Sequence, residues 1–281
     1  MNARSPTARA ARAFLRNPAA MVGLVVLALM VLASVAGPAL YGVDAIDIVG
    51  PPMSPPDGEA WFGTDYLGRD ILAAILVGGR ATMLVGVTAA LISVSIGTTV
   101  GALAGYLEGL ADAALMRVTE FFQVLPALLF AMVVVMLFRP SLVTVALSIG
   151  VVSWTGTARL VRAEFLRLKR LEFIEAARAE GATHARIIFR VILPNGMAPL
   201  IVSATLAVGA AMLFEGGLSF LGLGDPNVIS WGLMIGQNRS YLLDAWWTVT
   251  FPGLALFATV MSVALIGDGV NDALDPRSAG S

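Results

Sequence analysis

The chain has 281 residues, of which 58% are hydrophobic and 13% are charged, an apolar share far above that of an ordinary soluble domain. Its formal net charge of −1 gives no indication of nucleic acid as a partner, and without cysteine it has no disulfide and no thiolate metal site. A single histidine and a single lysine do not provide a histidine-based zinc site or a phosphate-binding P-loop. We therefore predict a membrane protein with no catalytic residue, no metal site and no cofactor of its own.

The first apolar run covers residues 19–36 and follows a basic arm at residues 1–18. A helix that crosses the hydrocarbon core needs roughly 20 residues, so this run is long enough. A basic arm, an apolar run and the small residues 33–36 are also typical of a cleavable signal peptide. Because the run is long for such a segment and more apolar runs follow, we favour an uncleaved first span.

Residues 37–79 contain several prolines and acidic residues and are predicted to form a polar loop outside the bilayer. Five further apolar runs follow, at about 81–106, 118–138, 142–161, 197–222 and 249–267. The sequence thus predicts an all-α membrane protein with six transmembrane helices. Its core is expected at residues 80–270, and a short tail at 271–281.

The basic residues indicate the orientation, because they accumulate on cytoplasmic loops. With the N-terminus inside, fourteen of the eighteen basic residues fall in the cytoplasm. The four that fall outside are Arg69, Arg80, Arg139 and Arg239. We therefore expect both termini to be cytoplasmic.

Three glycines in the second predicted span, Gly97, Gly101 and Gly105, recur at every fourth residue and so share one helical face. Such overlapping GxxxG patterns let another helix approach closely. Glycine is frequent in membrane helices, so the pattern predicts packing without naming a partner.

The loop at about 162–196, between the fourth and fifth spans, carries the most information about function. Leu168, Leu171, Ile174 and Ala177 recur at helical spacing beside polar residues and indicate an amphipathic helix. Glycine at 181 is a typical C-terminal stop, threonine at 183 can cap a second helix, and proline at 194 indicates a boundary. Amphipathicity alone fits two interpretations: a helix that lies on the bilayer and a helix that binds another protein.

The same loop resembles a motif of a known family. Glu175, Ala176, Ala177, Gly181 and the pair Leu193–Pro194 match the EAA loop of bacterial ABC importer permeases, with valine at 191 where isoleucine is usual. In that family the loop forms a coupling helix that docks on an ATPase subunit. The resemblance implies that these residues couple this chain to ATP hydrolysis, which partner subunits would supply.

Further stretches resemble the dipeptide, oligopeptide and nickel permeases, in particular the C-type subunit of each pair. The residues of the outer loop that carry this resemblance are Phe62, Gly63, Thr64, Asp65, Gly68, Arg69 and Asp70. Residues 218–224, 230–232, 251–253 and 267–277 also resemble this group, with valine and asparagine at 270–271 where leucine and arginine are common. Taken alone, the outer-loop stretch would be weak evidence for this resemblance, because glycine and aspartate also form simple turns.

The resemblance implies a type I ABC importer permease fold in a bacterial inner membrane. It implies as partners a homologous B-type permease, two ATPase subunits that bind ATP and magnesium, an extracytoplasmic binding protein and membrane lipid. The expected cargo is a dipeptide or oligopeptide, although relatives also carry nickel chelates, glutathione, sugars or opines. The implied mechanism is alternating access.

Two other classes of protein fit less well. An intramembrane enzyme is not favoured, because the sequence has no GxSxG, no HExxH and no paired intramembrane aspartates. A transporter driven by an ion gradient usually has ionisable residues at mid-membrane, and only Glu215 comes close. Glu215 either lines the pathway or contacts a second permease, or it lies near the outer interface where glycines follow it.

Overall fold

The computed structural model describes residues 6–274, and helices dominate this range. Five of them are long and apolar enough to cross a membrane: α2 (Pro18–Tyr41), α3 (Ile71–Leu107), α6 (Leu142–Lys169), α10 (Met197–Phe220) and α12 (Trp247–Leu274). A bent pair, α4 (Gly109–Val124) and α5 (Ala127–Phe138), makes six when it is counted as one crossing. The predicted all-helical fold is confirmed, and the predicted number of six spans is reached when the bent pair is one crossing.

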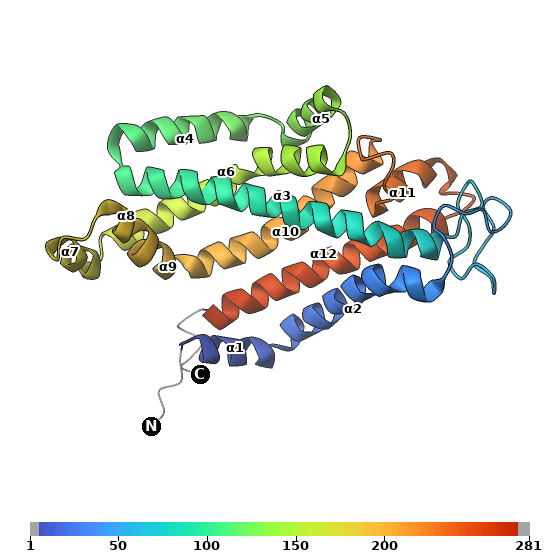
Figure 1. Cartoon of the computed structure of the whole chain (residues 1–281), viewed down its shortest axis with the longest axis horizontal. Helices are drawn as coiled ribbons and strands as arrows, with labels where there is room; N and C mark the ends of the chain where they lie inside the picture. Colours follow the sequence, from blue (N-terminus) through green and yellow to red (C-terminus); the bar gives the residue numbers. More distant parts are fainter. Residues whose placement is uncertain (1–5, 275–281) are drawn as a thin grey trace.

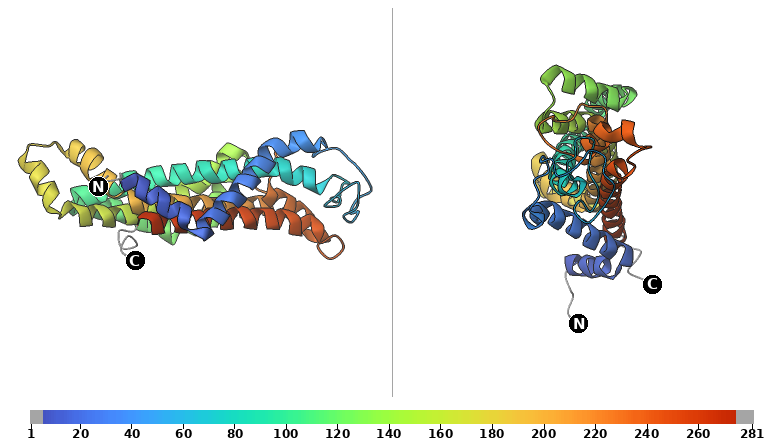
Figure 2. Two further views of the ribbon diagram at one scale, coloured as in Figure 1. Left: turned by 90° about the horizontal axis from the view of Figure 1, so that it is seen from below. Right: turned by 90° about the vertical axis from the view of Figure 1, so that its right-hand side faces the viewer.

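Helix α3 lies at the centre of the bundle and contacts α2, α4, α6, α10, α11 (Trp231–Asn238) and α12. The long helices run along a common axis, with α7 (Glu172–Ala179) and α8 (His184–Arg186) at one end and residues 42–70 and α11 at the other (Figure 1). We call these the α7 end and the α11 end. The pair α4–α5 and the pair α1 (Pro6–Arg16) and α2 lie on opposite sides of the bundle (Figure 2).

Local capping signals account for where several helices begin. Four helices begin after a residue whose side-chain oxygen accepts from backbone N–H groups of the first turn: α2 after Asn17, α3 after Asp70, α6 after Ser141 and α11 after Ser230. Each of these residue types satisfies N–H groups that the first turn of a helix leaves free. The first residue of α2 is also a proline. The residue that follows α2 and caps it is Gly42, whose φ of 75° suits a residue without a Cβ.

The first two long helices extend further than predicted. Helix α2 ends at Tyr41 and α3 begins at Ile71, so the segment between them covers residues 42–70 instead of 37–79. Arg80, which we placed near the end of a loop, lies inside α3. Its Nε donates to the Ser34 carbonyl at 2.7 Å. Pro38 lacks the N–H that would otherwise bond this carbonyl, so the arginine replaces a missing helical hydrogen bond.

The third predicted span, 118–138, was wrong as a continuous helix. It is broken at Leu125–Pro126 into α4 and α5, which are bent by 86°. Pro126 cannot donate to the preceding turn, and it favours the extended conformation that Leu125 adopts, with a ψ of 130°. Helix α5 has 12 residues. At 1.5 Å per residue it spans roughly 18 Å, too short to cross the hydrocarbon core alone.

Both ends of the chain differ from the predicted arm and tail. Within the predicted arm, residues 6–16 form α1, which contacts α12. Helix α12 continues to Leu274, inside the predicted tail. The remaining tail residues, with the final part of the 267–277 resemblance, lie outside the described residues, as do residues 1–5.

The glycine pattern of α3 packs against α6. A Cβ on Gly97 would lie 2.6 Å from the Thr157 Cβ, and one on Gly105 would lie 2.7 Å from the Arg162 carbonyl oxygen. Gly101 faces the backbone of Ala158 in the same way. The predicted close approach is confirmed, and its partner is a helix of the same chain. We call Gly97, Gly101 and Gly105 the glycine seam.

Candidate functional site

The loop after α6 contains a tight reversal at Gly181, which has a φ of 81°. The Gly181 N–H donates to the Arg178 carbonyl at 2.9 Å, and the Ala182 N–H donates to the Ala177 carbonyl at 3.0 Å. This pair of hydrogen bonds is a Schellman motif, in which a positive φ favours glycine. The Thr183 hydroxyl then accepts a backbone N–H at 3.3 Å at the start of α8. The predicted helix stop and helix cap are both confirmed.

The second half of the loop is less regular than one helix. Helix α8 continues into a π-helical segment, Ile187–Ile192, and then into α9 (Leu193–Asn195) before α10 begins at Met197. Leu193 and Pro194 therefore lie at the junction of the loop and α10, whereas the α7 turn lies at the far tip (Figure 1). Proline is tolerated there because the first turn of a helix leaves its N–H groups without helical partners.

Helix α7 buries one side and exposes the other. Ile174 is fully buried in an apolar cluster at the ends of α3 and α6 that includes Ala102, Tyr106, Phe165, Leu168, Ile187 and Ile192. Glu175, Ala176 and Gly181 are exposed, and Ala177 is half-buried. Four of the predicted coupling residues thus share the α7 end, and their outward surface is not used inside the chain.

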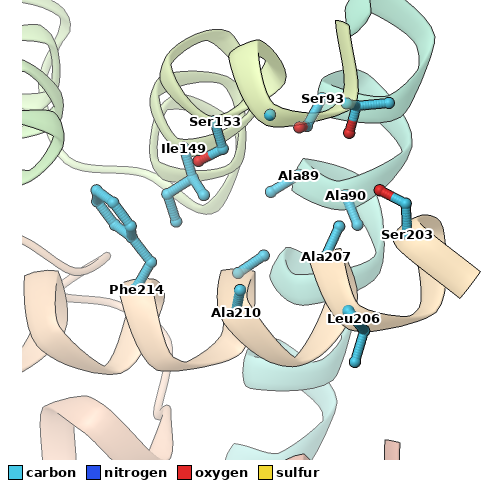
Figure 3. A pocket seen from close by; sticks show the side chains of 13 residues that line it. Ala89, Ala90, Ser93, Ile149, Ser153, Ser203, Leu206, Ala207, Ala210 and Phe214 are labelled. Carbon is cyan, nitrogen blue, oxygen red and sulfur yellow. The ribbon is translucent and has the colours of Figure 1, made fainter. Parts of the chain in front are cut away.

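A groove lies between α3, α6 and α10, with a volume of about 270 Å³. Alanine side chains from α3 and α10 form much of its wall, and Phe214 closes one side (Figure 3). The hydroxyl-bearing residues of its lining are Ser93, Ser153, Thr157 and Ser203. None of the described residues that line it is charged. We call it the serine groove.

A second, polar groove of about 710 Å³ lies between α4 and α6. Its lining includes Thr119, Gln123 and Arg159, and the Arg159 guanidinium donates to the Gln123 side chain at 3.3 Å. Arg162 also lines it and forms two hydrogen bonds with the Asp112 carboxylate, at 2.5 and 2.6 Å. This two-point ion pair between Arg162 and Asp112 joins α6 to the first part of α4, before the kink at Pro126.

Glu215 lies in α10 with 2% of its surface exposed, and its Oε1 accepts from the Ser219 hydroxyl at 2.6 Å. The hydroxyls of Thr82 and Ser230 face the same carboxylate, but Oε2 has no hydrogen-bond partner among the described residues. The Glu215 side chain therefore points from α10 toward α3 and the start of α11, and it does not line the serine groove. Neither interpretation of Glu215 included this burial among helices, and both stay predictions.

The resemblance in the outer loop includes two glycines whose conformation requires them. Gly63 and Gly68 have φ values of 75° and 83°. A Cβ on Gly63 would lie 2.6 Å from the Ser54 carbonyl oxygen. Thr64 donates to the Pro51 carbonyl at 2.7 Å, and Asp65 accepts from two backbone N–H groups, at 2.8 and 2.9 Å. These residues fold segment 42–70 onto itself.

Other residues of the same stretch attach this segment to the helices. Asp70 caps α3 and also accepts from the Tyr41 hydroxyl at 2.8 Å, which joins the end of α2 to the start of α3. Phe62 stacks on Phe251 of α12 with ring centroids 4.2 Å apart. Arg69 has a buried Nε that lacks a partner within the described residues. Most of the stretch therefore has a structural explanation in the fold.

The lining of the serine groove was not recognised from the sequence. The serines that face it are separated by long apolar runs, and only their helical positions on three different spans bring them together. A weak signal was present, because hydroxyl residues within apolar spans tend to face protein.

Five long apolar helices, the bent pair α4–α5, a groove between central helices and an exposed helical loop at one end are typical of a multi-span transport permease. The family described as "binding-protein-dependent transport system inner membrane component" matches residues 97–280. The N-terminal TM domain of oligopeptide transport permease C matches residues 5–56. The chain belongs to this family of inner membrane permeases of ABC importers.

Curated relatives agree with this assignment. The chain is 38% identical to the dipeptide transport system permease protein DppC of Alkalihalophilus pseudofirmus, over 97% of this chain and 90% of the relative. It is 38% identical to the oligopeptide transport system permease protein OppC of Haemophilus influenzae, over 95% of this chain and 88% of the relative. A solved structure of the MetNI methionine ABC transporter matches 70% of this chain and 94% of its own, with a TM-score of 0.56 and 21% identity. This last similarity supports the fold.

Proposed function

We propose that this chain is the C-type permease of an importer that moves dipeptides or oligopeptides across the bacterial inner membrane. One observation carries the proposal: Ile174 anchors α7 in the bundle, while Glu175, Ala176 and Gly181 remain exposed at the tip. A helix whose apolar side is already used within the chain presents its other side to a partner. The names of the relatives, which are dipeptide and oligopeptide permeases, support the choice of cargo.

In this proposal the α7 end is cytoplasmic and contacts one of two ATPase subunits, which bind ATP and magnesium. Both termini lie on the same side, as the distribution of basic residues favours. Segment 42–70 and α11 face outward and contact the extracytoplasmic binding protein. The chain performs no covalent chemistry, and the energy of hydrolysis comes from its partners.

The serine groove forms one wall of the translocation path, and a homologous B-type permease supplies the opposite wall. Alanine and serine side chains leave room for a peptide backbone, and the four hydroxyls offer hydrogen bonds without a fixed charge. A wall of this kind binds cargo weakly and does not select for its charge. Selection of the cargo then rests on the binding protein.

The coupling step follows from how α7 is attached. When closure of the ATPase dimer displaces α7, Ile174 transfers the movement to the apolar cluster at the ends of α3 and α6. Both helices also line the serine groove, so displacement at the α7 end changes the shape of the groove. Alternation between two shapes of the groove, one for each position of α7, opens the path to one side of the membrane at a time.

The test uses the complete complex in proteoliposomes, with ATP inside and peptide-loaded binding protein outside. The wild-type complex is expected to take up peptide only when ATP is hydrolysed. Glu175→Lys reverses a charge at the proposed contact, and Gly181→Val strains a turn that needs a positive φ, so both should abolish uptake while the complex still accumulates. Matched controls are Glu120→Lys and Gly109→Val in α4, outside both the loop and segment 42–70. Both residues are exposed, and Gly109 also has a positive φ, of 58°.

Three results would each overturn one part of the proposal. Normal uptake in the Glu175 and Gly181 variants would remove the loop from the ATPase contact. Uptake driven by an ion gradient without ATP would contradict the importer class. Stimulation of hydrolysis by a nickel chelate but by no peptide would contradict the cargo alone.

A further inference from the structure

The only histidine and the only lysine of the chain meet at one tyrosine, Tyr106, at the cytoplasmic end proposed for α3. Tyr106 is the penultimate residue of α3 and is 5% exposed. Its hydroxyl forms a hydrogen bond of 2.6 Å with Nδ1 of His184, the first residue of α8. Their rings meet edge to face, with centroids 5.6 Å apart. A residue of the loop is therefore attached directly to a helix that lines the serine groove.

Lys169, the last residue of α6, holds the same tyrosine from another side. Its Nζ donates to the Tyr106 carbonyl at 2.6 Å and to Glu108 at 3.0 Å, and it lies 5.3 Å from the centre of the Tyr106 ring. The last carbonyls of a helix lack intrahelical partners and favour a cation. Lys169 therefore joins the end of α6 to the end of α3 where His184 approaches.

The hydrogen bond between Tyr106 and His184 lies beside the apolar cluster that receives Ile174. Both Tyr106 and Ile174 belong to this cluster. Apolar packing resists separation but permits sliding, because the hydrophobic effect has no preferred direction. A hydrogen bond weakens steeply when its geometry changes. The apolar contact thus supplies adhesion between loop and bundle, and the hydrogen bond fixes their relative position.

Helix α3 continues from this point into the bundle. The glycine seam holds it against α6 between Gly97 and Gly105, and Ser93 beyond the seam lines the serine groove. From Tyr106 to Ser93 the distance along the helix is about 20 Å at 1.5 Å per residue. Movement of the loop that reaches Tyr106 therefore reaches the groove through one rigid helix.

We propose that Tyr106 is the positioning residue that makes the loop and α3 move as one body, with His184 as its partner and Lys169 as its support. The proposal rests on the proposed function, because it describes how movement of α7 reaches the translocation path. Without the hydrogen bond, the ATPase subunits still dock and still hydrolyse ATP, but part of each displacement is lost as slippage of the loop against α3.

The experiment measures peptide taken up per ATP hydrolysed, with the complete complex in proteoliposomes. Tyr106→Phe and His184→Phe each keep the ring and remove the hydrogen bond. Each should lower uptake per ATP by about 2- to 10-fold, the range that the net contribution of one hydrogen bond allows, while hydrolysis continues. The double variant should be no worse than either single variant, because all three lose the same interaction. His184→Asn, which keeps an acceptor near the position of Nδ1, should restore the ratio.

The matched control is Tyr41→Phe, which removes a hydrogen bond of 2.8 Å to Asp70 that joins α2 to α3 at the opposite end of the bundle. An unchanged ratio in Tyr106→Phe and His184→Phe would overturn the proposal, even if thermal stability falls, because stability without coupling is a purely structural role. Additive losses in the double variant would also overturn it. Failure of the proposed function is seen separately, as uptake without ATP hydrolysis by the wild-type complex.

Discussion

The glycine seam between α3 and α6 can be tested by adding a single methyl group. A Cβ on Gly101 would overlap the Ala158 carbonyl oxygen and would lie 2.8 Å from the Val161 Cβ. Carbon atoms in contact are normally about 3.5–4.0 Å apart. The obstructing oxygen belongs to the backbone of α6, which cannot rotate away as a side chain would. Gly101→Ala therefore forces the two helices apart.

The size of the effect follows from comparing this variant with a glycine that has free space. Overpacking a well-packed core costs about 1–3 kcal/mol. Alanine also favours the helix over glycine by up to about 1 kcal/mol, and this gain is common to every helical glycine. Apart from the backbone of their own helix, no atom of the described residues lies within 4 Å of a Cβ added to Gly217 in α10 or Gly253 in α12. Gly101→Ala should thus be less stable than Gly217→Ala or Gly253→Ala by about 1–3 kcal/mol.

The assay is thermal inactivation of the purified complex in detergent, with all variants heated at one rate because unfolding of such proteins is often irreversible. The expected difference lowers the midpoint of Gly101→Ala by several degrees, since 1 kcal/mol corresponds to roughly 2–4 °C in a protein of this size class. The two control variants should match or exceed the wild type. Equal midpoints for Gly101→Ala and the controls would refute close packing at the seam.

Three further predictions concern orientation, packing and capping. A cysteine at Pro55 should react with a membrane-impermeant thiol reagent in intact cells, and one at Glu180 only after permeabilisation; the chain has no cysteine of its own, and labelling in the opposite order would contradict the proposed topology. Glu215→Gln keeps an acceptor for the Ser219 hydroxyl, so this variant should assemble and transport normally, whereas Glu215→Ala should lower thermal stability by about 1–3 kcal/mol. Loss of peptide-stimulated ATP hydrolysis in an assembled Glu215→Gln complex would instead place Glu215 in the pathway. Asp70→Ala should destabilise α3 by about 0.5–2 kcal/mol in a thermal assay, with Asp70→Asn near wild type, and equal midpoints would contradict the capping role.

Features that depend on neighbouring residues were predicted well from the sequence. The turn at Gly181 and the cap at Thr183 follow from interactions within a few residues, and the structure has both. The apolar runs likewise located the long helices, because lipid requires every crossing segment to be apolar and to bond its own backbone. The loop that resembles the EAA motif was found for the same reason, since its residues are close together in the chain.

Direction and length of helices were predicted less well. Residues 118–138 are mostly apolar, and hydropathy contains no information about the 86° bend at Pro126. Arg80 suggested the end of a loop, because a charge inside an apolar helix is costly. The structure offsets this cost because the Arg80 guanidinium donates to two carbonyls of α2, those of Ser34 and Val35. To predict these hydrogen bonds, one would have to know that α2 and α3 are neighbours.

The sequence by itself determined the class of protein, the approximate positions of the long apolar helices and the position of the loop, because composition, helical period and capping are local properties. Only the tertiary structure decided which distant residues meet. Tyr106 and His184 are 78 residues apart in the chain, and the serine groove takes its wall from three separate helices. From the sequence, Glu215 was expected to line the pathway, to contact a second permease or to lie near the outer interface; the structure shows that it is buried beside Ser219. Such contacts depend on how whole helices pack, and the period of any one helix specifies only which face it turns inward.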